Sequence, residues 1–255
     1  MSTDLKLADV IADLLADSPV AEAQTVIKDL KTIVGRNINA ELETALRAYN
    51  VANNVVIDCD GTDVVLSEWN ADENDTFVDF ARGVSVQVDH LSQKPVRVEQ
   101  LETSQECVAL HSQIEDYLEE KFPSQYALLV APDAEHIVII GEKQSPANFW
   151  NARWTSKYEI QGQFISGTVD IDVHYYEDGN VRLKTKQEVS GDIESTIAAA
   201  ISKIEDKLQL SLQKTIVDIN TTQFKNLRRP LPVTRSKVQW GKAIGNYRLG
   251  KDVSN

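Results

Sequence analysis

The sequence has 255 residues, a formal net charge of −13, and 42% hydrophobic and 25% charged residues. This length suffices for a buried core in one large or two modest domains, and the composition excludes disordered and fibrous proteins. Acidic residues interrupt the apolar positions of the first 19 residues, unlike a secretory signal, and no stretch approaches the ~18 consecutive apolar residues of a membrane span. The sequence therefore predicts a soluble intracellular protein.

The first 50 residues predict a bundle of short helices. Apolar residues recur at helical spacing in three stretches, and Gly35 is expected to end the second helix. Ser18 and Pro19 are typical of a helix start, an N-cap followed by a proline at the first helical position. The stretches contain Leu5, Ile11, Leu14 and Leu15, then Val26, Ile27, Leu30, Ile33 and Val34, then Leu42, Ala45, Leu46 and Tyr49.

The next segment predicts hairpins and one helix. Two apolar runs, 55–57 and 64–66, flank Asp60-Gly61, a strong hairpin signal. Residues 84–88 alternate between apolar and polar side chains, as in a half-buried strand. A helix is expected over about 99–122 because apolar residues there share one side.

The central part predicts an antiparallel meander followed by one long helix. The apolar runs are joined by short polar links, whereas a parallel pair would need a long crossover. From Ile193 to about Val217, apolar residues repeat at spacings of three and four, as in an amphipathic helix. A helix of ~25 residues spans roughly 37 Å, enough to lie across a sheet. The strands are expected at 126–130, 136–140, 152–160, 164–176 and 181–186.

No pattern of residues predicts an active site. The histidines are scattered, and the two cysteines lack zinc-ligand spacing and are expected to be unpaired thiols. Asp170 and Asp172 alternate along a strand and are interpreted as part of a solvated sheet face. We therefore expect no enzyme, no cofactor and no metal. The histidines and cysteines considered are His90, His111, His136, His174, Cys59 and Cys107.

The charges are unevenly distributed along the chain. Residues 223–255 contain eight basic residues and one acid, a net charge of +7, so the preceding residues hold 18 basic and 38 acidic residues, a net charge of −20. An acidic body with a basic tail usually marks a surface for an acidic partner. Anionic lipid or nucleic acid would also attract the tail, but the acidic body would repel a polyanion within a Debye length, ~8 Å at physiological salt.

Within the tail, a proline-containing connector precedes a short amphipathic stretch. Pro230 and Pro232 exclude a regular helix and favour an extended connector. Beyond them, Trp240, Ile244 and Tyr247 fall at helical spacing, but two glycines weaken that helix by roughly 1 kcal/mol each. A marginal basic helix is suited to docking on another molecule, and packing of Trp240 and Ile244 back on the body is the alternative.

Two motifs resemble those of a known family. The segment FKNLRRPLPVTRSK at 224–237 closely resembles the C-terminal signature of the F-actin capping protein alpha subunit. A second match combines NFWNARW at 148–154 with VHYYEDGNV at 173–181, and VDHL at 88–91 agrees with both. The likeness covers essentially the full chain, although the N-terminal region matches only in pattern and Pro230 replaces a polar residue of relatives.

The resemblance implies an α+β fold and a heterodimer. An N-terminal helical bundle (1–50) would precede an antiparallel sheet with long helices and the dimer interface (51–222), and a basic amphipathic actin-binding extension (223–255) would follow. The long helix would cover the sheet, and a beta subunit of similar fold would join its own sheet to this one, covering exposed strand edges. The heterodimer would cap the barbed ends of actin filaments in the cytoplasm, within the actin cytoskeleton. It would block subunit addition and loss, and would require no calcium, nucleotide or other cofactor.

The resemblance also gives roles to residues of the tail. Because actin is acidic, the basic residues would form the first electrostatic contact and raise the association rate, and the apolar residues would slow release. Phosphoinositides and acidic regulatory proteins would compete for the same basic surface, and an anionic-lipid-binding module is the alternative function. Trp150 and Trp154 are expected to belong to the fold or the dimer. The expected actin-binding residues are Lys225, Arg229, Arg235, Lys237, Trp240 and Ile244.

Overall fold

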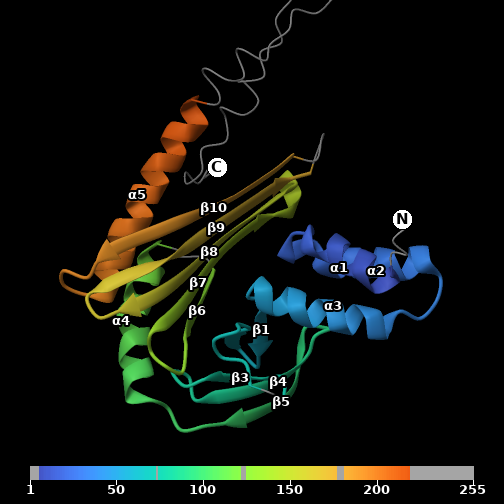
Figure 1. Cartoon of the computed structure of the whole chain (residues 1–255), viewed down its shortest axis with the longest axis horizontal. Helices are drawn as coiled ribbons and strands as arrows, with labels where there is room; N and C mark the ends of the chain where they lie inside the picture. The colour runs from blue at the N-terminus through green and yellow to red at the C-terminus, as the bar shows by residue number, and fades with distance from the viewer. Residues whose placement is uncertain (1–5, 73, 122–124, 177–180, 219–255) are drawn as a thin grey trace, which may run out of the picture. The chain divides into compact units, whose positions relative to one another are not determined.

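The computed structural model describes residues 6–72, 74–121, 125–176 and 181–218. The chain divides into two compact units, Met1–Ala200 and Ile201–Asn255. The first unit combines helices with antiparallel sheets, which confirms the predicted mixed class (Figure 1). Among the described residues, no helix is long and apolar enough to cross a membrane.

The N-terminal segment forms the three predicted helices and one short 3-10 turn. Gly35 ends the second helix in the left-handed conformation (φ 67°), and its N–H donates to the carbonyl of Lys31 at 3.2 Å. The predicted N-cap role of Ser18 is wrong, because its hydroxyl donates instead to the Leu14 carbonyl of the preceding helix at 2.7 Å. The elements are α1 (Leu7–Ala16), η1 (Val20–Glu22), α2 (Ala23–Val34) and α3 (Asn39–Ala52).

These helices share one apolar core with the small strands that follow them. Leu15 of α1 and Leu42 and Leu46 of α3 are fully buried, and α1 packs against α3. Leu14 and Ile33, which the sequence places on the buried stripes, are exposed. Neighbouring residues on a helix point about 100° apart, so Leu14 turns outward where Leu15 turns inward.

Two small antiparallel sheets follow. The predicted hairpin is confirmed, with Asp60 and Gly61 in the left-handed region (φ 56° and 88°) as a type I′ turn requires. The second sheet, in the order β3-β4-β5, contains two strands that the sequence analysis missed, β3 and β5. The strands are β1 (Val56–Cys59), β2 (Thr62–Val65), β3 (Thr76–Asp79), β4 (Val84–Asp89) and β5 (Lys94–Gln100).

The helix predicted over 99–122 begins later than expected. Glu99 and Gln100 are the last residues of β5 and pair with β4, so α4 runs only from Gln105 to Lys121. The side-chain oxygen of Ser104 lies at the start of this helix and accepts from the N–H of Cys107 at 3.5 Å. Both cysteines of the chain, Cys59 and Cys107, are buried free thiols.

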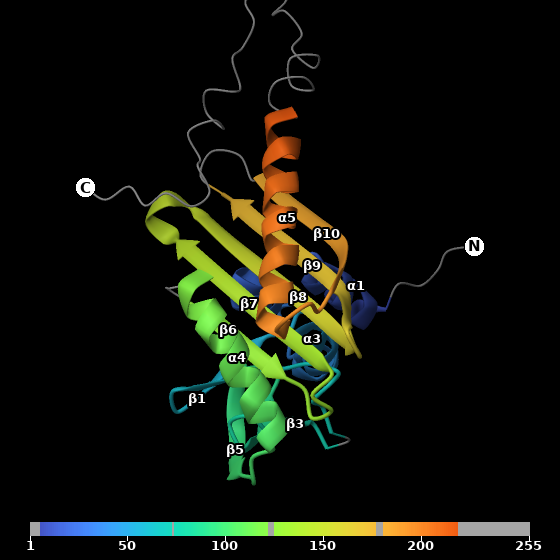
Figure 2. The same ribbon diagram turned by 90° about the vertical axis from the view of Figure 1, so that its left-hand side faces the viewer.

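The large sheet is the predicted antiparallel meander, in the order β10-β9-β8-β7-β6. Its last three strands are each twelve residues long and pair along their whole length. The N-terminal helices lie on one face of this sheet, and α4 packs against β6 on the other (Figures 1 and 2). The strands are β6 (Tyr126–Val130), β7 (His136–Ser145), β8 (Trp150–Gln161), β9 (Phe164–Tyr175) and β10 (Val181–Asp192).

The predicted long helix is α5 (Ile197–Asp218), whose greater part belongs to the second unit. It starts four residues later than expected because β10 extends to Asp192, and Thr196 caps it by accepting from the N–H of Ala199 at 3.1 Å. The predicted cover of the sheet by this helix, and the domain boundaries at residues 50 and 222, stay predictions.

Candidate functional site

The six residues expected to contact actin lie outside the described residues. Lys225, Arg229, Arg235, Lys237, Trp240 and Ile244 all belong to the segment 219–255. Their roles therefore stay predictions. Most of the second motif, by contrast, lies in the described strands β8 and β9 of the large sheet.

The two halves of this motif are neighbours in space. Asn151 of β8 is directly opposite His174 of β9, and Arg153 of β8 is opposite Asp172 of β9. Because side chains on a strand alternate between faces, these four side chains share the face that carries the N-terminal helices. Trp150 and Trp154 point to the other face and are half-buried, and the Trp154 indole N–H donates to Ser156 Oγ at 3.0 Å.

Glu22 of η1 contacts this motif from the side of the N-terminal helices. Its Oε1 atom accepts from Nδ2 of Asn151 at 3.0 Å and also contacts Nδ1 of His174. His174 is buried, whereas a third of the Glu22 side chain is exposed. The motif residues thus hold the start of α2 against the sheet.

Arg153 makes a second connection, to the end of α3. Its Nη2 atom donates to the carbonyls of Asn53 (3.1 Å) and Asn54 (2.8 Å), and its Nη1 atom pairs with Glu142 of β7. A guanidinium is well placed here because the carbonyls at a helix C-terminus lack partners and carry partial negative charge. Burial lowers the pKa of Arg153, and the neighbouring carboxylate of Glu142 opposes that shift.

Arg182 of β10 makes a third connection, to the end of α1. Its guanidinium forms a bidentate ion pair with Asp172, in which Nε donates to Oδ1 at 2.8 Å. The same guanidinium also contacts the Asp17 carbonyl. The interpretation of Asp172 as a solvated residue is therefore wrong, since it is largely buried in an ion pair. Asp170 fits that interpretation better, with only a 3.6 Å contact to the exposed Lys186.

We call this set the helix–sheet junction: Glu22, Glu142, Asn151, Arg153, Asp172, His174 and Arg182. A cavity of about 20 Å³, room for about one water molecule, lies between residues 19–21 and the junction residues Glu142, Asn151, Arg153 and Asp172. The junction is therefore a packed structural contact and not a pocket for a ligand. Sequence reasoning missed Glu22, because nothing in its local sequence distinguishes it from other surface acids.

The VDHL motif is also structural. Asn50 of α3 donates from Nδ2 to Nδ1 of His90 (3.2 Å) and to its carbonyl (3.1 Å), and receives a hydrogen bond from Gln93 at 2.9 Å. Burial lowers the pKa of His90, Asp75 opposes that shift, and Arg47 adds to it. These contacts fix the β4–β5 turn to α3.

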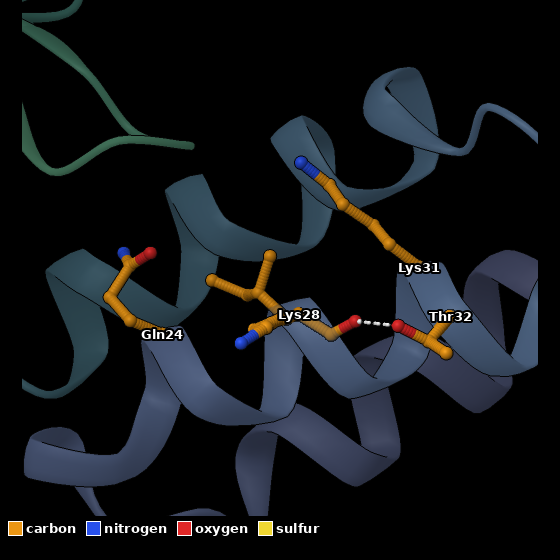
Figure 3. A pocket seen from close by; sticks show the side chains of 5 residues that line it. Gln24, Lys28, Lys31 and Thr32 are labelled. Atoms are coloured by element: carbon orange, nitrogen blue, oxygen red, sulfur yellow. Dashed lines mark hydrogen bonds between the residues drawn. The ribbon is translucent and has the colours of Figure 1, made fainter.

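A surface hollow of about 420 Å³ lies along α2. Gln24, Lys28, Lys31 and Thr32 line it from successive turns of the helix, together with Ile27 (Figure 3). The Thr32 hydroxyl donates a hydrogen bond to the Lys28 carbonyl at 2.9 Å. This lining offers neither an acid–base pair nor a nucleophile with its base.

In the described part of the chain, no group of three or more acidic, histidine or cysteine side chains is placed to hold a metal.

The fold and the junction together define a class of α+β proteins whose N-terminal helices are anchored to a long antiparallel meander. The family model of the F-actin capping protein alpha subunit matches residues 11–252. The chain belongs to this family.

Individual relatives agree over nearly the full length. The F-actin-capping protein subunit alpha of Candida glabrata is 41% identical over 254 residues, covering 96% of each chain. The subunit of Saccharomyces cerevisiae is 35% identical over 262 residues, 98% of this chain and 97% of the relative. The solved structure of the homodimeric actin capping protein alpha subunit from Plasmodium berghei, at 19% identity, has the same fold with a TM-score of 0.64, covering 90% of this chain and 98% of that one.

Proposed function

We propose that this chain is the alpha subunit of a heterodimeric capping protein that binds actin filament barbed ends without calcium and blocks subunit addition and loss. The observation that carries the proposal is the family match, which extends over residues 11–252 and so includes the basic segment. The protein would act in the cytoplasm, with the actin cytoskeleton.

The open edge of the large sheet supports a partner subunit. In the described part of the chain, β10 pairs only with β9, so the other side of this twelve-residue strand presents unpaired backbone groups. Unpaired backbone groups at a sheet edge can pair with a strand of another chain, and a beta subunit of similar fold would supply that strand. The exposed Leu183 of β10 adds apolar surface at this edge.

The tail would bind in two stages. Lys225, Arg229, Arg235 and Lys237 would attract the acidic filament end, and Trp240 and Ile244 would then bury apolar area and slow dissociation. The net charge of +7 on residues 223–255, against −20 on the rest, gives this attraction a defined location. Phosphoinositides and acidic regulatory proteins would compete for the same charges.

Elongation of pyrene-labelled actin from barbed ends tests the proposal. The chain is coexpressed with a candidate beta subunit, and the copurified complex is expected to stop barbed-end growth in the presence of a calcium chelator. A chain ending at Thr222 is expected to keep the dimer and lose most of the inhibition. Full capping by that truncated complex would refute the role of the tail. A chain that is a stable monomer, binds anionic vesicles and does not cap would identify the lipid-binding alternative.

A further inference from the structure

The open edge of the large sheet carries an ordered pattern of charges. Strand β10 pairs with β9 along its whole length, and in the described part of the chain no strand pairs with its other side. All the charged residues of β10 are at even positions, so alternation places them on one face of the sheet. The first half of the strand is basic and the second half acidic: Arg182, Lys184 and Lys186, then Glu188 and Asp192.

The charges near the middle of the strand are accessible to a partner. The Lys186 side chain is 62% exposed and has a contact of 3.6 Å with Asp170 of β9. Its neighbour on the same face, Glu188, is also exposed. Arg182 differs, because its guanidinium is largely buried in the bidentate pair with Asp172. Lys186 and Glu188 are therefore the charges through which this edge would recognise another strand.

The order of the charges favours an antiparallel partner of the same sequence. In a parallel pair of two identical strands in register, each charge would lie beside its own copy. Like charges directly opposite each other destabilise a strand pair, whereas opposite charges stabilise it. In an antiparallel pair, the basic half of one strand lies along the acidic half of the other.

One antiparallel register satisfies the charges best. When Gln187 lies opposite Gln187 of a second copy, Lys186 lies opposite Glu188, and Arg182 lies opposite Asp192. Two-fold symmetry repeats both contacts, so opposite charges meet four times and like charges do not meet directly. A shift of the centre by one residue, which keeps the charges on one face, instead places Lys186 opposite Lys186 or Glu188 opposite Glu188.

We infer that β10 binds a second copy of this chain as an antiparallel strand centred on Gln187, which gives a symmetric homodimer. Leu183, which is 45% exposed, adds apolar surface to the contact. The end of α1 contacts β10 at Arg182, near the start of the strand, so the two copies hold this contact at opposite ends of the paired strands. The inference goes beyond the proposed function, because it needs neither actin nor a beta subunit. A beta subunit would compete for the same edge.

A cysteine at the centre of the pair tests the register, in the soluble extract of cells that express the full chain alone. Directly opposite residues of antiparallel strands have Cα atoms about 4.5–5.5 Å apart, within the range of about 4.4–6.8 Å that a disulfide spans. Gln187→Cys is therefore expected to give a disulfide-linked dimer under mild oxidation. The two native cysteines are buried.

Thr185→Cys is the matched control for this crosslink. Residue 185 lies on the same face of β10 as residue 187, but in the inferred register its own copy lies four residues, roughly 13 Å, further along the strand. The control is therefore expected to stay uncrosslinked. No dimer from Gln187→Cys, or an equal yield from Thr185→Cys, would overturn the inference.

Exchange of charges tests the pairing itself. Lys186→Glu places two glutamates opposite each other, and Glu188→Lys places two lysines opposite each other, so each variant alone is expected to dimerise about tenfold more weakly in sedimentation experiments. When the two variants are coexpressed, glutamates face lysines. An affinity tag on one variant is then expected to capture the other variant in preference to its own copy.

Two changes on β5, the edge strand of the small sheet, provide the matched control. Lys94→Glu and Glu99→Lys change the net charge of the chain by the same amounts, and both residues are exposed. Each is expected to dimerise as the wild type does and to show no preference for the other. A preference among these controls, or its absence between the β10 variants, would contradict the inference.

Coexpression with a beta subunit separates this inference from the proposed function. The beta subunit is expected to suppress the Gln187→Cys crosslink by occupying the edge. Crosslinked homodimers together with a heterodimer that does not cap barbed ends would refute the proposed function alone. Capping by the heterodimer, with no crosslink from the chain expressed alone, would refute the homodimer alone.

Discussion

Gly167 of β9 packs so closely against β8 that a Cβ atom added to it would lie 1.9 Å from the carbonyl oxygen of Lys157. The obstacle is backbone, which cannot rotate away as a side chain can. Gly167 is also opposite Tyr158, which is fully buried, so the strands cannot separate without opening the core. The sheet therefore requires glycine here.

We accordingly expect Gly167→Ala to lower the free energy of unfolding by about 1–3 kcal/mol, as overpacking of a dense core does. Urea denaturation of the purified complex measures this change. Gly162→Asn is the matched control: Gly162 lies in the turn before β9, with open space around it and φ of 65°, a conformation that asparagine tolerates. A loss in the control equal to that of the alanine variant would contradict the steric explanation.

Replacement of Arg153 is expected to loosen α3. Arg153→Met removes the donor from the Asn53 and Asn54 carbonyls and leaves the Glu142 carboxylate without its partner, at a cost of about 3 kcal/mol. Adding Glu142→Gln to this variant is expected to restore part of the loss, because the unpaired charge is then gone. Thermal and urea unfolding of both variants, and of Glu142→Gln alone, measures the interaction free energy between Arg153 and Glu142. Strictly additive losses of stability would show that the two residues do not stabilise each other.

Acid is expected to destabilise the protein through its buried histidines. Burial lowers the pKa of His111, with a further contribution from Arg82, and Glu115 opposes the shift. The unfolded chain, with imidazole near 6.5, therefore binds more protons than the folded one. Stability is complete above about pH 6.5 and is lost as the pH falls below it. His111→Leu is expected to reduce the loss between pH 7 and pH 5 in urea titrations, and an unchanged loss would assign it to other groups.

Charge reversal in the tail is expected to change association more than dissociation. Arg229→Glu with Arg235→Glu would replace attraction to an acidic filament end by repulsion, so the association rate should fall about tenfold or more at low salt. The wild type should lose this advantage as salt increases. Trp240→Ala should instead raise the dissociation rate. Single-filament microscopy measures both rates, and equal effects of the two changes on dissociation would contradict the division of roles.

The helices and the meander were predictable because their signals are local. Helical spacing within ten to twenty residues located α1–α3, and continuous apolar runs with short links located β6–β10. Strand β5 was missed because all its side chains except Pro95 are exposed, so burial imposes no alternation on its sequence. The predicted start of α4 was also too early. Glu99 has a high helix propensity, but in the structure it pairs with Ser85 of β4 and belongs to β5.

The helix–sheet junction was only half predictable. The resemblance pointed to Asn151, Arg153 and His174 as a motif, but gave no indication of the partners that they bind. Those partners, Glu22 and the carbonyl of Asn53 among them, lie about a hundred residues or more away in the sequence. Pairings of this kind are decided by the tertiary structure, and no local pattern marks them.

The separation between Glu22 and His174 also sets an order of events during synthesis. The ribosome adds roughly 5–20 residues per second, so Glu22 emerges about 8–30 seconds before His174. The β8–β10 meander, by contrast, pairs neighbours and can form as soon as it appears. The helices can bury Leu15, Leu42 and Leu46 with the small strands that emerge next, but Glu22 and the carbonyls at the helix ends gain their partners on the sheet only when β8–β10 have been made.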